Sequence, residues 1–573
     1  MDIKTIIVKE YLESLTESEE LDYIFPLFLE SQGFIILSNP TETKGLSQYG
    51  KDIVAVGNDF EDGIQKRFYF ELKGGGDRNI TTATYTKQDG IRDSIIEAKD
   101  KKFDFIDKKH EKLPLKIMLV HNGEVKGDIK NTLTDFVNKE FPQNGDIEFG
   151  ILGISELTKY FSDKFFGEFL LASKDATKYF NKTLVNLDVE EKVSSNFTKL
   201  LDSIFNGVNR DEYKQNLPRK WKMMFESLRL ISFIIYTESK NEYNNLDIAK
   251  RYITYLLVHL WHWVLKNKLE KDKKIFPYLV KVIEFYSFVM REYFGRTLPI
   301  AYIKDGLFSD MGGRYEQVGY TCRTFEYLQY LCWWLKLSAN DNVLFLKEFV
   351  TKILIPFLNA NNVCLRPLLD IHSIPIIDTL MLLIETGNKT AAINYLSGVL
   401  FFLKFGKEKY NRLPDANNNK ENVIKFIVAK EKPIYYSDST SLLIAILMEF
   451  IVILDMPDKY YEIRDFIKKH EIDLGIFVPH HGINSTSKHL IEDKENDLEE
   501  QLFSKYFFND GYQHEMFLLK DFNKDLSYEE FKEKILLLKD EFTYEYRSDQ
   551  FIRDLAHIYF RTPYFPDKWR CLL

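Results

Sequence analysis

The feature that most constrains this chain is a change in the spacing of its apolar residues near residue 165. Before that point, short β-branched and aromatic runs alternate with stretches of helical periodicity. Beyond about residue 188, strand-like runs nearly disappear and apolar residues recur at helical spacing. We therefore expect an α/β domain over residues 1–165, a linker over 166–186 and a large all-α domain over 187–573, in which turn clusters could separate two subdomains.

The composition limits the class of protein. A chain of 573 residues is too long for one hydrophobic core, and 45% hydrophobic with 28% charged residues excludes disorder over most of its length. Its four cysteines include no Cys-x-x-Cys pair, so neither a disulfide framework nor a cysteine zinc site is expected. The start lacks the pattern of a secretory signal and no long uncharged apolar stretch occurs, which predicts a cytoplasmic protein without membrane association.

The first 165 residues predict a defined order of elements. An amphipathic helix spans about 18–32 and ends at Gly33, and Pro26 suggests that its regular part starts late. Strands are expected at 34–37, 52–56, 67–73, 117–120 and 147–152, and further helices at 88–99, 128–139 and from 155 onward. This order predicts an α/β sandwich around one mixed sheet.

Two of these strands place acidic residues opposite each other. The second and third strands are joined by a polar loop and should form an antiparallel hairpin. The loop and the pair Asp52 and Glu71 are both centred between residues 61 and 62, so a symmetric register puts the two acids opposite each other, to within about one residue. Side chains alternate along a strand, so Lys73 lies on the same face as Glu71.

Like charges directly opposite each other destabilise a sheet, so this pair indicates a bound cation. Mg²⁺, for which Mn²⁺ can substitute, prefers oxygen ligands, and Asp52, Glu71 and the main-chain carbonyl of Leu72 would supply them. Such a cation polarises a phosphodiester and lowers the pKa of a bound water, which Lys73 would orient or deprotonate. The alternative is a salt-bridged sheet edge where Lys73 only neutralises the two acids.

These residues and the elements around them resemble the PD-(D/E)XK nuclease superfamily, and within it the Mrr-like restriction endonucleases. Asp52 matches the first acid of the motif, Glu71 the second acid and Lys73 its lysine. The resemblance covers roughly residues 15–160 and implies a restriction-endonuclease-like αβββαβ core. It also implies a Mg²⁺-dependent endonuclease that hydrolyses nucleic-acid phosphodiester bonds, with DNA as the favoured substrate and a role in restriction or anti-phage defence.

The resemblance implies two further catalytic residues. In the Mrr-like group an acid on the first helix completes the site, and the candidates here are Asp22 and Glu20. A glutamine is common on the helix after the lysine strand, and Gln88 matches it. The acid would position the metal or its water, and the glutamine would position the substrate or the lysine. Lys51 stands where the motif often has proline, which is a departure from the pattern.

Other functions remain compatible with the same residues. One alternative is an RNA-cleaving enzyme of this fold, and another is a catalytically inactive protein that binds nucleic acid or drives assembly. The helical domain would sense a trigger, bind a protein partner or assemble nuclease domains. A homo-oligomer is expected because one such site cuts one strand. The net charge of −9 argues against a wholly basic surface but not against a local basic groove.

Overall fold

The computed structural model of the chain describes the residues 3–38, 51–88, 90–103, 107–143, 145–164, 174–189, 193–208, 213, 217–269, 271–340, 342–434, 436, 438–474, 525–541, 552, 554–555, 558–559 and 568–573. These residues belong to two compact units. The first unit comprises Met1–Leu256 and Asp272–Phe285, and the second comprises Leu257–Lys271 and Tyr286–Leu573.

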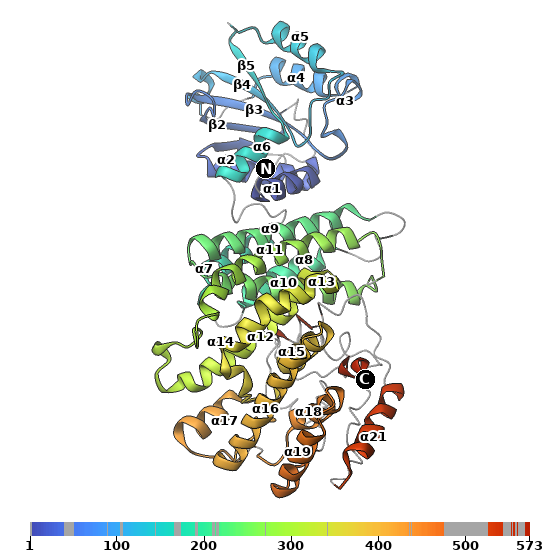
Figure 1. Ribbon diagram of the computed structural model, residues 1–573. Coiled ribbons are helices and arrows are strands. Elements are labelled where there is room, and N and C mark those ends of the chain that lie inside the picture. The colour runs from blue at the N-terminus through green and yellow to red at the C-terminus, as the bar shows by residue number, and fades with distance from the viewer. Residues whose placement is uncertain are drawn as a thin grey trace. The chain divides into compact units, whose positions relative to one another are not determined.

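The first unit contains the predicted mixed sheet (Figure 1). Its strands lie side by side in chain order: β1 (Ile35–Ser38), β2 (Ile53–Asn58), β3 (Gln65–Lys73), β4 (Leu115–His121) and β5 (Ile147–Leu152). The first three strands pair antiparallel, and β3, β4 and β5 pair parallel because helices cross between them. All five strands were expected from the sequence, and the α/β architecture is confirmed.

Helices cover both faces of this sheet, as Figure 1 shows. On one face, Tyr69, Ile117 and Leu119 form a core with residues of α3 (Thr82–Thr86), α4 (Ile91–Asp100) and α5 (Lys130–Glu140). On the other face, aromatic rings from the sheet meet α2 (Asp22–Ser31) and α6 (Ile154–Lys164). The contacts there include Phe25 with Phe70 at 5.3 Å between ring centroids and Phe28 with Phe161 at 4.7 Å.

The N-terminal segment differs from the expectation. A helix that we did not predict, α1 (Ile3–Ser14), packs against α6 and against α9 (Arg219–Asn241). The predicted helix over 18–32 is a π-helical turn, η1 (Glu17–Leu21), followed directly by α2. Pro26 lies buried inside α2 rather than in its first turn.

The remainder of the described chain is helical. The first unit continues with α7 (Lys174–Val185), α8 (Ser195–Asn206) and α9, and the division between the units passes through α10 (Leu246–Lys266) and α11 (Phe276–Ala301). Helix α7 lies within the stretch predicted as a linker, while 165–173 lie outside the described residues. None of the helices in the described part of the chain is long and apolar enough to cross a membrane.

The second unit holds the other helices: α12 (Glu316–Ala339), α13 (Val343–Phe349), α14 (Ile355–Ala360), α15 (Ser373–Glu385), α16 (Lys389–Tyr410), α17 (Lys420–Ile424), α18 (Leu442–Ile453), α19 (Pro457–Lys469) and α21 (Tyr528–Glu541). Apolar residues keep a helical spacing over 379–405, but the chain forms two helices there, α15 and α16. Gly387 has a φ of +76°, a conformation that ends α15 and lets the chain start α16.

Candidate active site

The hairpin register brings the predicted acids to one end of the sheet. Strands β2 and β3 pair from Asn58 opposite Gln65 to Ile53 opposite Phe70. Asp52 directly precedes β2, and its main-chain N–H donates to the Phe70 carbonyl at 2.9 Å. The register derived from the loop symmetry is therefore the register of the structure, with a local irregularity at Asp52.

Asp52, Glu71 and Lys73 come together where β3 ends. One Asp52 carboxylate oxygen, Oδ2, accepts a hydrogen bond from the main-chain N–H of Leu72 at 2.7 Å. The Lys73 ammonium lies 2.7 Å from Glu71 Oε1. Glu71 and Leu72 are buried, and the Lys73 side chain is only 14% exposed. Three charged groups therefore share a small region from which water is largely excluded.

A fourth charged group comes from the N-terminal segment, and the sequence analysis did not select it. Glu17, the first residue of η1, has Oε1 3.7 Å from the Lys73 ammonium. Its other oxygen accepts a hydrogen bond from the Gly74 main-chain N–H at 3.4 Å. Gly74 allows this approach, because a Cβ there would lie 2.6 Å from the main-chain nitrogen of Glu17.

Glu17 thus takes the position that the sequence analysis gave to Asp22 or Glu20. The Glu20 carboxylate instead accepts a hydrogen bond from the Thr16 hydroxyl at 2.7 Å, which fixes the turn that starts η1. Asp22 is the first residue of α2, with one carboxylate oxygen buried. The acids whose charges raise the pKa of Lys73 are Glu71, Glu17 and Asp52.

The remaining predicted site residue lies elsewhere. Gln88 is exposed in the turn between α3 and α4, not on the helix where the sequence analysis placed it. That helix, α4, begins later, at Ile91, after Gly90. Gly90 packs against the main-chain oxygens of Lys87 and Thr84, so the chain turns there before the helix can start.

The pKa values of the charged groups in this region are shifted from their usual values. Burial, with the nearby charge of Glu71, raises the pKa of Asp52 to about 8, against the opposing effects of Lys73 and the Leu72 N–H. Burial also raises the pKa of Glu17, and the charge of Glu71 adds to it. The pKa of Lys73 is raised, because the three acids outweigh the effect of its burial. Burial is therefore the main cause that disfavours the ionised acids, and the charge of Glu71 adds to it.

Lys51 adds a second ammonium group that the sequence analysis noted only as a departure from the motif. It is buried, and its Nζ lies 5.2 Å from the centroid of the Tyr69 ring. Burial lowers the pKa of Lys51 to about 8, although Glu97 of α4 and Glu71 act in the opposite direction. The lysine therefore links the acid cluster to the helix that covers this face of the sheet.

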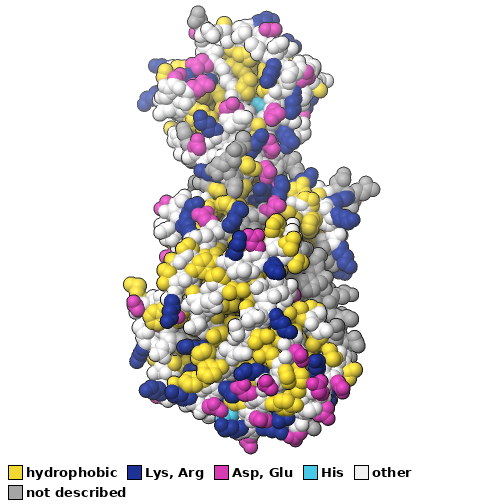
Figure 2. Space-filling view, viewed as in Figure 1, with side chains coloured by type: hydrophobic (Ala, Val, Ile, Leu, Met, Phe, Trp, Pro, Cys, Tyr) yellow, Lys and Arg dark blue, Asp and Glu magenta, His cyan; other side chains and the backbone are white. Residues whose placement is uncertain are grey.

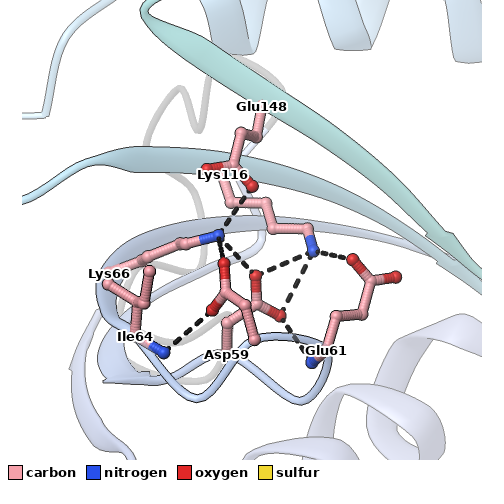
Figure 3. Close-up of polar contacts among 7 residues, drawn as sticks. Asp59, Glu61, Ile64, Lys66, Lys116 and Glu148 are labelled. Carbon is pink, nitrogen blue, oxygen red and sulfur yellow. Dashed lines mark hydrogen bonds and ion pairs between the residues drawn. The ribbon is translucent and has the colours of Figure 1, made fainter. Parts of the chain in front are cut away.

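A second cluster of charges, with Lys66, Lys116 and Glu148, lies where β3, β4 and β5 begin (Figure 3). Oxygens of Asp59, Asp62 and Glu148 lie within 4.8 Å of one another, as metal ligands would. However, the Lys66 ammonium is 2.7 Å from Asp59, 2.6 Å from Asp62 and 2.7 Å from Glu148. Lys66 already supplies the cation, so this arrangement is an ion-pair network rather than a candidate metal centre.

Comparisons of the chain with protein-family models, with curated proteins and with solved structures find no match. The fold places the protein in the class that combines an α/β domain, here with a five-stranded mixed sheet, with a large helical region. The charged cluster at the carboxyl end of β3 is its candidate active site, and it lies at the edge where sheets with parallel strands commonly place such sites.

Proposed function

We propose that the protein is a metal-dependent nuclease that hydrolyses phosphodiester bonds, with DNA as the favoured substrate and restriction or anti-phage defence as the role. The observation that carries this proposal is the convergence of Asp52 and Glu71 beside Lys73. Asp52 reaches the peptide N–H that follows Glu71 at 2.7 Å, and Lys73 pairs with Glu71 at 2.7 Å.

The residues present fit a hard divalent cation such as Mg²⁺ or Mn²⁺. Asp52 and Glu71, with Glu17 nearby and the Leu72 carbonyl in the same segment, form an all-oxygen donor set. The pKa of Asp52 is raised to about 8 mainly by burial and in part by the charge of Glu71, and a bound divalent cation would lower it by stabilising the ionised carboxylate. When bound, a divalent cation supplies charge for the phosphate and a water of lowered pKa.

The residues of the chain have separate roles in the proposed reaction. The three acids raise the pKa of Lys73 and favour its ammonium form, in which it would donate hydrogen bonds to the attacking water or to a phosphate oxygen. Glu71 holds that ammonium in place through the 2.7 Å ion pair. The Leu72 N–H fixes the orientation of the Asp52 carboxylate.

The test uses the purified full chain with supercoiled plasmid, single-stranded DNA and RNA, each with Mg²⁺, Mn²⁺ or EDTA. Asp52→Asn, Glu71→Gln and Lys73→Met should each lower the cleavage rate by roughly 100-fold or more. Asp135→Asn and Lys130→Met are matched controls, because these two residues are exposed on α5 of the same domain. Both controls should cut as well as the unchanged chain.

The outcomes separate the alternatives. Cleavage of RNA alone would favour the RNA-directed enzyme, and cleavage that survives in all three site variants would place the activity elsewhere. The absence of cleavage with every substrate and metal would favour the salt-bridged edge of a binding or assembly protein. If plasmid becomes linear without a nicked intermediate, two sites act together, as the proposed homo-oligomer requires.

A further inference from the structure

In the second unit, one face of α16 exposes a row of aromatic rings. Phe401 is 59% exposed, Phe405 38% and Tyr410 52%, and Phe402 is half-buried beside them. The rings contact one another: centroids are 5.2 Å apart for Phe401 and Phe402, 6.2 Å for Phe401 and Phe405, and 5.8 Å for Phe405 and Tyr410. A contiguous exposed row of this kind indicates a surface that binds something.

Cations lie over these rings. The Arg366 guanidinium is 4.4 Å from the Phe402 centroid, and the Lys409 ammonium is 5.2 Å from that of Phe405. Arg412 lies 5.9 Å from the centroid of Tyr410. We call these three cations and the four rings the α16 patch.

The cations of the α16 patch differ from the lysines around them. In the part of the chain that the structure describes, no carboxylate forms an ion pair with Arg366, Lys409 or Arg412. Neighbouring lysines are neutralised in contrast: Lys404 lies 2.6 Å from Glu462, and Lys469 lies 3.3 Å from Glu408. Among the described residues, the patch therefore combines exposed rings with positive charges that form no ion pair.

The surrounding sequence is basic as well. Residues 404–432 contain eight Lys and Arg against four Asp and Glu, in a chain with a net charge of −9. Figure 2 shows Lys and Arg side chains beside hydrophobic ones over the lower left of the molecule, where α16 and α17 lie in Figure 1. The local charge is complementary to an anionic partner.

We propose that the α16 patch binds single-stranded nucleic acid. Bases would stack on the exposed rings, and phosphates would contact Arg366 and Lys409, whose side chains are exposed, which is how proteins bind single strands without reading their sequence. A duplex hides its base faces inside the stack. From Phe401 to Tyr410 the helix rises about 13 Å, which is long enough for more than one nucleotide. The inference rests on this patch alone and does not require nuclease activity.

The experiment measures binding of fluorescently labelled dT12 to the full chain by anisotropy, in EDTA so that no metal-dependent cleavage occurs. Phe405→Ala/Lys409→Gln should weaken binding about tenfold or more. The matched control is Phe345→Ala/Lys347→Gln on α13, where Phe345 is 54% exposed and Lys347 is also exposed. This control should leave the affinity unchanged, and both variants should retain the circular dichroism of the unchanged chain.

Single substitutions test the chemistry of the patch. Lys409→Gln should reduce the slope of log affinity against log salt by about 0.7, because one phosphate contact is lost, whereas Phe405→Ala should weaken binding without changing that slope.

Three results would overturn the proposal: no binding of dT12, equal binding by the patch variant, or equal affinity for a matched 12-base-pair duplex. Binding to anionic lipid vesicles in place of dT12, lost in the patch variant, would assign the surface to a membrane. Because every arm runs without metal, a failure here is distinct from a failure of the proposed nuclease.

Discussion

At the scale of single residues, the candidate active site places two acids close together in a region from which water is largely excluded. Asp52 and Glu71 meet at the buried end of a hairpin, and their repulsion contributes to the raised pKa of Asp52. Such an arrangement costs stability, which is common where function requires it. This cost in stability can be measured without any substrate.

Asp52→Asn should stabilise the protein in EDTA by about 1 kcal/mol, because it removes a carboxyl group whose ionised form is disfavoured by burial and by Glu71, while the amide oxygen can still accept from Leu72. Thermal unfolding measures this change, with Asp135→Asn as the exposed control. Added Mg²⁺ should raise the melting temperature of the unchanged chain more than that of the variant. A loss of stability in EDTA would instead identify Asp52 as a structural partner of Lys73.

Asp59→Asn should have the opposite effect and destabilise the fold by roughly 3–5 kcal/mol, since it leaves two buried lysines without their shared counter-charge. Lys66 and Lys116 are both 2% exposed, at 2.7 and 2.9 Å from Asp59. Chemical denaturation at pH 7 measures the loss. The control Glu61→Gln, whose side chain is 74% exposed, should cost less than about 1 kcal/mol.

The ion pairs of Asp59 make the stability of the fold depend on pH. Burial works against the ionised form of Asp59, but hydrogen bonds from Lys66 and Lys116 lower its pKa below the usual value. The stabilisation from a lowered pKa is present above the unfolded-state pKa, near 3.9, and is lost as the pH falls through the folded-state pKa. The difference in stability between the unchanged chain and Asp59→Asn should therefore shrink below about pH 4; a constant difference would contradict this linkage.

At the scale of elements, the close contact between β3 and η1 decides which acid reaches Lys73. The two segments touch at Gly74, where a Cβ would lie 2.6 Å from the Glu17 nitrogen and 2.9 Å from the Thr16 carbonyl carbon. Both contacts are with main-chain atoms, which cannot rotate away as a side chain can. The geometry of the site therefore depends on a glycine that carries no chemistry.

Gly74→Ala should displace η1, lower the melting temperature and weaken Mg²⁺ binding measured by calorimetry, because Glu17 moves away from Lys73. Gly76→Ala is a close control in the same loop, since a Cβ there meets nothing within 4 Å. That control should change stability by less than about 0.5 kcal/mol. Equal effects of the two substitutions would show that the contact with η1 does not matter.

At the scale of the whole molecule, the sheet-containing region and the first long helices form one unit. Helix α1 packs against both α6 and α9, and buried charges join it to the helices. Arg229 of α9 pairs with Glu226 at 2.6 Å and with Glu10 of α1, and Lys281 lies 3.5 Å from Glu10. The N-terminal helix is thus held by residues more than 200 positions away in the sequence.

Arg229→Met should destabilise this unit by roughly 3–5 kcal/mol, because Glu226 would stay buried without its main partner. Hydrogen exchange should accelerate in α1, which loses its link to α9. Arg296→Met removes an exposed pair with Glu292 and should cost less than about 1 kcal/mol. Unchanged exchange in α1 would mean that its apolar contacts alone fix its position.

Sequence reasoning succeeded where the relevant interactions are close in the chain. The five strands followed from alternating and β-branched runs, and the hairpin register followed from the symmetry of one loop about residues 61 and 62. The sequence did not predict the position of single residues in segments where several similar residues lie close together. The charged run around η1 contains several acids, and the contact with Gly74 favours Glu17, while Gln88 falls in a turn rather than on α4.

The sequence by itself determined the α/β domain, its strands and the register of the hairpin that carries Asp52 and Glu71 at one end, because periodicity and hairpin pairing are local properties. Only the tertiary structure decided that Glu17 lies beside Lys73, that α1 packs against α9 and that Lys66 forms ion pairs with the acids around Asp59. These arrangements depend on segments that are distant in the chain. Local spacing carries no information about which distant surfaces pack together, so only the folded chain shows them.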